Sequence, residues 1–168
     1  MKQNSQYRII GIDPGLRLTG WGIIDYHNNK LIYLDSGVIT SCKKDSLTSK
    51  IHYIHTELDN IIKKYQPNIA AIEETFINNN NKSSLILGHA RGGILLGLAL
   101  NNLPVYEYAT RLIKKTVSGN GKADKNQIKK MIEYLLVTNK IKKEITYDET
   151  DALATAICYT SHQHLCEY

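Results

Sequence analysis

The chain has 168 residues, of which 42% are hydrophobic and 22% are charged. These values are typical of a soluble globular protein with a buried core, and they exclude a disordered or fibrous chain. We expect a single domain over residues 1–168, because no stretch rich in proline, glycine or serine divides it. The 21 Lys+Arg exceed the 16 Asp+Glu, and this net charge of +5 indicates an anionic partner only weakly.

Cysteine usage and apolar segments bear on the cellular compartment. Three cysteines cannot all pair and show no metal-binding spacing, which favours a reducing compartment. Residues 1–10 lack the apolar segment of a signal peptide. The most apolar stretch, residues 85–100, contains His89 and Arg91, so we expect it to be too short and too polar to span a bilayer. We therefore expect a cytoplasmic protein without a membrane partner.

The first third of the chain predicts three strands and a helix. Apolar runs at 7–13, 20–26 and 31–39 are joined by short turns, which predicts an antiparallel meander. Apolar residues then recur at helical spacing over 47–65, and Pro67 ends that helix.

The remainder alternates strands with helices. A buried strand is expected at 68–76, and Ser83 or Ser84 can cap a helix that runs to about Asn101. The other expected elements are a strand at 104–108 and helices at 110–117, 124–137 and from about Thr146. The order βββ-α-β-α-β-α-α-α predicts a mixed sheet with helices on its faces, an α/β fold.

Carboxylates end two of the apolar strands. Asp13 follows Ile9–Ile12 and precedes the turn residues Pro14-Gly15, where it could also form an Asx turn. Glu73 and Glu74 close the strand at 68–76. Neighbouring strand residues face opposite sides, so only one of this pair can join a given site, and periodicity does not say which.

Two further carboxylates, Asp148 and Asp151, lie three residues apart in the last helix and share a face. Thr146 and Glu149 form a capping-box pattern, so Asp148 could simply favour the helix dipole. Four carboxylates converging on one pocket would repel one another, and Mg²⁺, which prefers oxygen ligands, relieves that repulsion. Two such ions can activate a water and stabilise the leaving oxygen of a phosphodiester.

Four segments in this order resemble the RuvC family of Holliday-junction resolvases: GIDPGLRLTGWGII, AIEETFINNNNKSSLILGHARG, YATRLIKKTVSGNGKADKNQIKKMI and DETDALATAICY. The resemblance covers residues 8–162. It implies a ribonuclease-H-like fold with a mixed five-stranded sheet and helices on both faces. It also implies a homodimer that resolves four-way junction DNA by paired symmetric nicks, with two Mg²⁺ ions per subunit for which Mn²⁺ substitutes. A branch-migration complex of the RuvA and RuvB type is the implied protein partner.

The resemblance assigns catalysis and metal binding to four acids: Asp13, Glu73, Asp148 and Asp151. It selects Glu73 over Glu74, because the acid of the family motif directly follows the Ala-Ile pair. We expect Asp13 to bridge both ions, Glu73 and Asp151 to complete one site, and Asp148 to help the other. Hydrolysis would leave a 5′-phosphate and a 3′-hydroxyl.

The DNA-binding candidates begin with six lysines around a Gly-Asn-Gly turn: Lys114, Lys115, Lys122, Lys125, Lys129 and Lys130. This cluster could neutralise phosphates, or it could be an ordinary solvated helix face. The resemblance ranks Lys114 and Lys125 highest, because the matching family lysines lie near the active site, and Lys122 is a further candidate.

Three other features admit two interpretations. Phe76, the only Phe, could cap the core. The resemblance implies that it stacks on unpaired bases at the junction centre, and the polar residues after it favour exposure and therefore stacking. Arg91 is a weaker DNA-contact candidate. The Gly88/Gly92 and Gly93/Gly97 pairs let another helix approach closely, either within the domain or across a two-fold interface.

Two other classes of protein compete with a resolvase. A non-catalytic DNA-binding module is disfavoured by the intact acids at all four positions. A nucleotide-handling enzyme of the related actin-like and sugar-kinase fold would need phosphate-binding loops and a much longer chain, and the sequence has neither.

Overall fold

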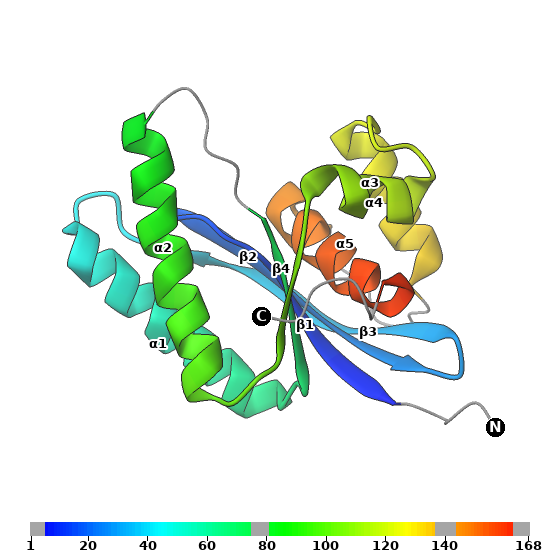
Figure 1. The fold of residues 1–168 in the computed structure, drawn as a ribbon, viewed down its shortest axis with the longest axis horizontal. Helices are drawn as coiled ribbons and strands as arrows, with labels where there is room; N and C mark the ends of the chain where they lie inside the picture. Colours follow the sequence, from blue (N-terminus) through cyan, green and yellow to red (C-terminus); the bar gives the residue numbers. More distant parts are fainter. Residues whose placement is uncertain (1–5, 75–80, 137–143, 163–168) are drawn as a thin grey trace.

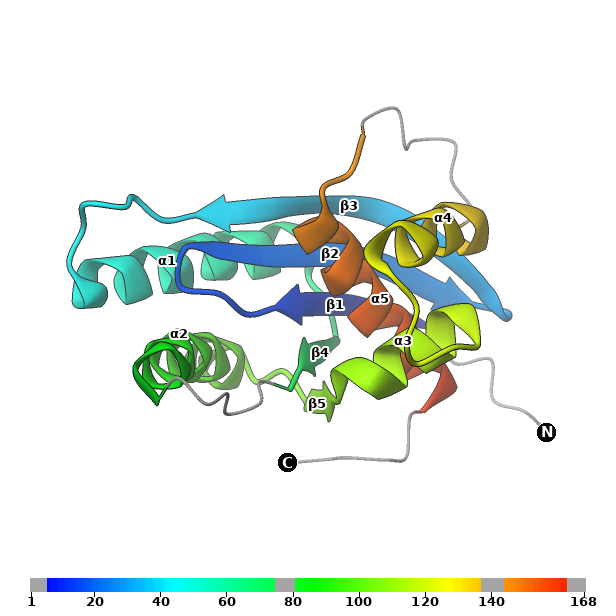
Figure 2. The ribbon, with the colours of Figure 1, turned by 90° about the horizontal axis from the view of Figure 1, so that it is seen from above.

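The computed structural model describes residues 6–74, 81–136 and 144–162. Five strands form one sheet in the order β3-β2-β1-β4-β5, which Figure 2 shows side by side from above. The strands are β1 (Tyr7–Asp13), β2 (Leu18–His27), β3 (Lys30–Thr40), β4 (Ile69–Glu73) and β5 (Val105–Tyr108). The first three pair antiparallel, whereas β4 and β5 join β1 in parallel register. The sheet is mixed and five-stranded, as expected.

Helices cover both faces of the sheet (Figure 1). They are α1 (Leu47–Tyr65), α2 (Asn81–Leu100), α3 (Thr110–Ser118), α4 (Lys125–Leu135) and α5 (Tyr147–Ser161). Alternate residues of β1 enter different cores: Ile10 packs in the cluster that contains residues of α1 and α2, whereas Ile9 packs in the cluster of α3, α4 and α5. Successive strand residues point to opposite faces of the sheet, so α1 and α2 pack on one face and α3, α4 and α5 pack on the other.

The turns and caps explain why most elements begin and end where the sequence predicts. Asn28 and Asn29 take positive φ angles of 51° and 61°, which suits a two-residue hairpin turn between β2 and β3. Asp124 caps α4 and Thr146 caps α5, each in a complete capping box. Ser46 caps α1, whose bounds of 47 and 65 match the expectation.

Two boundaries differ from the expectation. α2 already includes Asn81, so Ser83 and Ser84 lie within the helix and do not cap it. β4 ends at Glu73 rather than at residue 76. Phe76 lies outside the described residues.

α2 also corrects the expectation about its length and polarity. Ser83–Leu100 is long and apolar enough to cross a membrane by length and composition. In the fold, however, Ile94 and Leu98 of this helix are fully buried in the core cluster that also contains residues of α1. One side of α2 is therefore a core element of the fold.

Candidate active site

Two of the four predicted acids lie side by side on neighbouring strands. Parallel pairing aligns Ile12 of β1 with Ile72 of β4, and Asp13 and Glu73 are the next residues on each strand. Glu73 follows the alternation of Ile69 and Ala71, which pack in the cluster on the α5 side of the sheet. Strand alternation therefore directs Glu73 to the α5 face.

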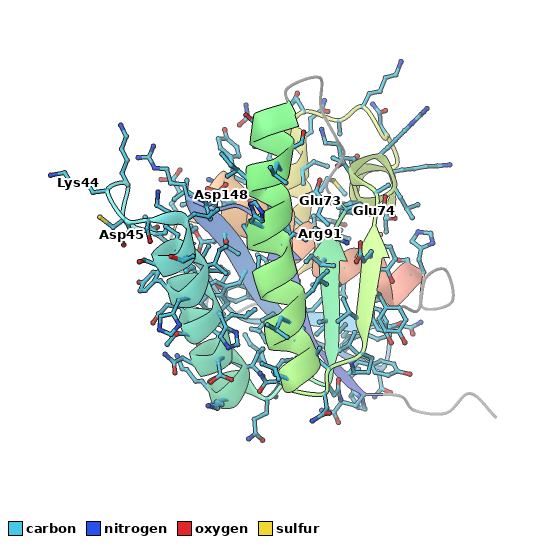
Figure 3. All side chains as sticks on the ribbon, turned by 60° about the vertical axis from the view of Figure 1, so that its left-hand side comes forward. Lys44, Asp45, Glu73, Glu74, Arg91 and Asp148 are labelled. Carbon is cyan, nitrogen blue, oxygen red and sulfur yellow. The ribbon has the colours of Figure 1, made fainter. Side chains whose placement is uncertain are left out.

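The other two acids come from the first two turns of α5: Asp148 lies in the first turn and Asp151 follows three residues later. Figure 3 labels Asp148 at the start of α5 and Glu73 at the end of β4. The helix can come this close because Gly20 lacks a side chain: a Cβ there would lie 2.1 Å from the Asp148 carbonyl oxygen. Gly20 pairs with Asp13 in the β1–β2 ladder, so this close approach brings the start of α5 to the strand beside Asp13.

The acids perturb one another's ionisation. The pKa of the Asp13 carboxyl rises from 3.8 to about 8, chiefly through burial and further through the charges of Glu73, Asp151 and Asp148. Burial is also the main cause that raises the pKa of Glu73 and of Asp151. The nearby ammonium of Lys125 opposes the rise at each of these three acids. The four carboxylates thus form one electrostatic cluster.

A cavity of about 280 Å³ opens at this cluster. Its lining combines three of the acids with two lysines and a threonine over an apolar floor: Asp13, Glu73, Asp151, Lys114, Lys125, Thr110, Ile113, Ile128 and Ala154. Asp148 is not among the lining residues, although its charge acts on Asp13 and Asp151. A pocket with acids beside basic side chains can hold a cation and a phosphate together.

Two polar contacts hold the acids in place. Lys125 Nζ lies 3.4 Å from Asp151 Oδ2, and the hydroxyl of Thr110 donates to Glu73 Oε1 at 2.5 Å. The ring of Tyr147 lies beneath Lys125, 5.6 Å from its ammonium. No sequence pattern singled out Thr110 or Tyr147 as a site residue. Tyr147 directly precedes Asp148 and could have been noticed, whereas no local pattern links Thr110 to Glu73.

The donor set fits a hard divalent cation by its chemistry, since carboxylate oxygens are the ligands that such ions prefer. A cation would also relieve the carboxylate repulsion that adds to the effect of burial on the pKa of Asp13. Among the residues that the structure describes, no three His, Cys, Asp or Glu side chains already stand as a ligand set. The case for a divalent cation therefore rests on the charge and the donor atoms of these residues, and the arrangement of their side chains does not add to it.

Two other DNA-binding candidates, Lys122 and Arg91, are not among the residues that line this cavity. Lys122 is exposed in the turn between α3 and α4, where its backbone N–H donates to Asn120 Oδ1. Arg91 forms an ion pair with the buried carboxylate of Glu107 and lines a second cavity between α2 and β5. This ion pair with a buried carboxylate gives Arg91 a structural role that does not require DNA.

Comparison with known proteins identifies the family. The family model described as "Crossover junction endodeoxyribonuclease RuvC" matches residues 9–159. The chain belongs to this family. It is 47% identical over 156 residues to the RuvC of Methylorubrum extorquens (strain PA1), covering 93% of this chain and 81% of that protein. The RuvC of Gluconobacter oxydans (strain 621H) is 45% identical, with 93% and 91% covered.

Solved RuvC structures share the fold. Thermus thermophilus RuvC in complex with a Holliday junction substrate superposes with a TM-score of 0.83 at 24% identity, covering 94% of each chain. This likeness confirms the ribonuclease-H-like fold. Membership of the RuvC family makes the chain a nuclease, a hydrolase of a metal-dependent family.

Proposed function

We propose that this RuvC-family chain resolves four-way DNA junctions by paired symmetric nicks, in recombination and DNA repair. The observation that carries the proposal is the convergence of four carboxylates from β1, β4 and α5 beside a cavity that Lys114 and Lys125 also line. Hydrolysis of a phosphodiester needs negative charge to be neutralised at both the metal ligands and the phosphate. This cavity offers groups for both tasks.

Asp13, Glu73, Asp148 and Asp151 are the proposed catalytic residues and metal ligands, with Asp13 shared between two ions. Bound Mg²⁺, or Mn²⁺ in its place, would lower the pKa of a water and stabilise the leaving oxygen. The water oxygen forms a bond to phosphorus while the bond from phosphorus to O3′ breaks. The departing O3′ takes up a proton, which leaves a 3′-hydroxyl and a 5′-phosphate.

The DNA backbone is the proposed partner of Lys114, Lys122 and Lys125, whose charges would neutralise phosphates. Phe76 is proposed to stack on an unpaired base, and Arg91 is the weakest candidate because Glu107 already pairs with it. A cytoplasmic location and association with a branch-migration complex of the RuvA and RuvB type complete the proposal.

We also propose a homodimer formed through α2. Gly93 and Gly97 face α1, where added Cβ atoms would meet Ile51 and His55 at 2.7 Å each. By contrast, no neighbouring atom of the described residues lies within 4 Å of a Cβ added at Gly88 or Gly92. They continue a helical stripe with three leucines that are 58–64% exposed: Leu85, Leu96 and Leu100. An apolar stripe of this kind suits a second copy of the same helix, which would align two active sites for paired cuts.

The test is a cleavage assay on a synthetic four-way junction and on a linear duplex of the same sequence, each with Mg²⁺ or with EDTA. We expect symmetric nicks in the junction alone, and only with Mg²⁺. Asp13→Asn should lower the cleavage rate at least a hundredfold and leave junction binding intact. Unimpaired cleavage by this variant would contradict the metal-site assignment, and equal cleavage of the linear duplex would contradict junction selectivity.

A further inference from the structure

Among the residues that the structure describes, Thr110 is the only uncharged polar one that lines the cavity of the acids. Its Oγ1 donates a hydrogen bond to Glu73 Oε1 at 2.5 Å. The two residues are 37 positions apart in the chain. Neither the RuvC-family motifs quoted above nor the acid pattern assigns Thr110 a role.

The hydroxyl of Thr110 is available because its own helix does not use it as a cap. α3 begins at Thr110, and its N-cap is Ala109, which makes no side-chain cap hydrogen bond. In α4 and α5, by contrast, the side-chain oxygens of the N-cap residues Asp124 and Thr146 accept hydrogen bonds from backbone N–H groups of the first turn. The Thr110 side chain instead points toward Glu73 at the end of β4.

The backbone holds Thr110 at this position. Glu73 is aligned with Tyr108 in the parallel β4–β5 ladder, and the N–H of Glu74 donates to the Tyr108 carbonyl oxygen at 2.9 Å. Only Ala109 separates this ladder from the start of α3. The contact between Thr110 and Glu73 thus follows from strand register and does not depend on a mobile loop.

Beside this geometry, the hydrogen bond from Thr110 also opposes the effect of burial on Glu73. Burial raises the pKa of Glu73 and the carboxylate of Asp151 adds to the rise, whereas the hydrogen bond from Thr110 acts in the opposite direction. Lys114, one turn further along α3, also favours the charged form.

We propose that Thr110 is a positioning residue that holds the Glu73 carboxylate through Oε1 and leaves Oε2 for a divalent cation. The inference rests on the proposed function, in which Glu73 is a metal ligand. In this role Thr110 acts through Glu73, to which its hydroxyl donates. Its contribution is a fixed orientation of one ligand before the cation arrives.

The experiment compares Thr110→Val, which keeps the shape and loses the hydroxyl, with Thr110→Ser, which keeps the hydroxyl. Binding of Mn²⁺ to the DNA-free full chain is followed by electron paramagnetic resonance. Thr110→Val should bind Mn²⁺ about tenfold more weakly, the effect of losing one hydrogen bond to a charged group. Thr110→Ser should bind within about twofold of the unchanged protein.

Cleavage provides a second measurement. Thr110→Val should need about tenfold more Mg²⁺ for half-maximal junction cleavage, with an unchanged KM for the junction. The matched control is Thr116→Val on the same helix, whose hydroxyl contacts the Leu112 carbonyl oxygen and His162 instead of the acids. This control should leave Mn²⁺ binding and cleavage unchanged.

The possible outcomes separate the two proposals. Unchanged Mn²⁺ binding in Thr110→Val overturns the positioning role. So does a loss that Thr110→Ser fails to restore, or an equal loss in Thr116→Val, because either one indicates general disturbance of α3. Glu73→Gln tests the underlying assignment: if it binds Mn²⁺ and cleaves like the unchanged protein, the proposed ligand role of Glu73 itself fails.

Discussion

Asp13 combines a rigid position with an unfavourable charge. It ends the central strand β1, and burial together with three neighbouring carboxylates raises its pKa to about 8. In the unfolded chain the same group has a pKa of 3.8. Between pH 3.8 and about 8, the Asp13 carboxyl is protonated in the folded protein and ionised in the unfolded chain. The free energy of unfolding therefore decreases as the pH rises through this range.

This difference predicts the pH dependence of stability without divalent cations. The contribution of Asp13 is fully present below pH 3.8 and is lost as the pH rises through about 8. In EDTA, the melting temperature of the unchanged protein should therefore fall relative to that of Asp13→Asn between pH 5 and pH 9. Adding Mg²⁺ at pH 9 should recover stability in the unchanged protein more than in the variant. Parallel melting curves across this pH range would contradict the raised pKa.

At the scale of elements, the docking of α5 on the sheet brings the acids together. Gly11 permits the contact, because a Cβ there would lie 2.0 Å from the Ala152 carbonyl oxygen. Glu149, 1% exposed, lies between the two acids of this helix, where its carboxylate accepts from the Thr146 N–H and from Ser36 Oγ. The capping box therefore also bonds α5 to β3, since Ser36 belongs to that strand.

This bond predicts a difference between two buried serines. Ser36→Ala should cost about 1–3 kcal/mol, because it removes a donor from a buried carboxylate. Ser41→Ala is the matched control: Ser41 is 3% exposed and donates to the neutral carbonyl oxygen of Leu16, so about 0.5–1.5 kcal/mol is expected. Urea denaturation measures both. An equal or smaller loss for Ser36→Ala would show that the bond to Glu149 does not secure α5.

At the scale of the whole molecule, the two faces of the sheet serve different purposes. The face with α3, α4 and α5 supplies the acids of α5 and the predicted DNA-binding lysines, whereas α1 and α2 cover the other face. α2 buries Ile94 and Leu98 against the core and leaves Leu96 and Leu100 exposed. Core packing thus satisfies only one side of this helix, and its exposed leucines remain available to a second copy.

The dimer proposal predicts a change in association. Leu96→Glu should convert a dimer into a monomer at micromolar concentration in sedimentation velocity, because it places a charge in the apolar stripe of α2. Ile32→Glu on the edge strand β3, where Ile32 is 37% exposed, is the control that should remain dimeric. A Leu96→Glu variant with an unchanged dimer would exclude this stripe as the interface.

Local patterns predicted most of the fold. The bounds of α1 at 47 and 65, the hairpin turn at Asn28-Asn29 and both capping boxes depend on residues within a few positions of one another. The start of α2 was predicted wrongly at Ser83 or Ser84, because two good capping residues stood inside an uninterrupted helix. The polarity of the helix was misjudged too, since its His and Arg are outweighed by the leucines around them.

The sequence by itself determined the fold class, the order of the elements and the RuvC-family motifs with their four acids. Only the tertiary structure decided which side of β4 Glu73 faces, which glycine pair packs on α1, and that Arg91 pairs with Glu107. It also brought Thr110 to Glu73 across 37 residues and Ser36 to Glu149 across 113. Periodicity and capping are short-range properties of the chain, whereas these contacts depend on strand register and helix docking, which no neighbouring residue encodes.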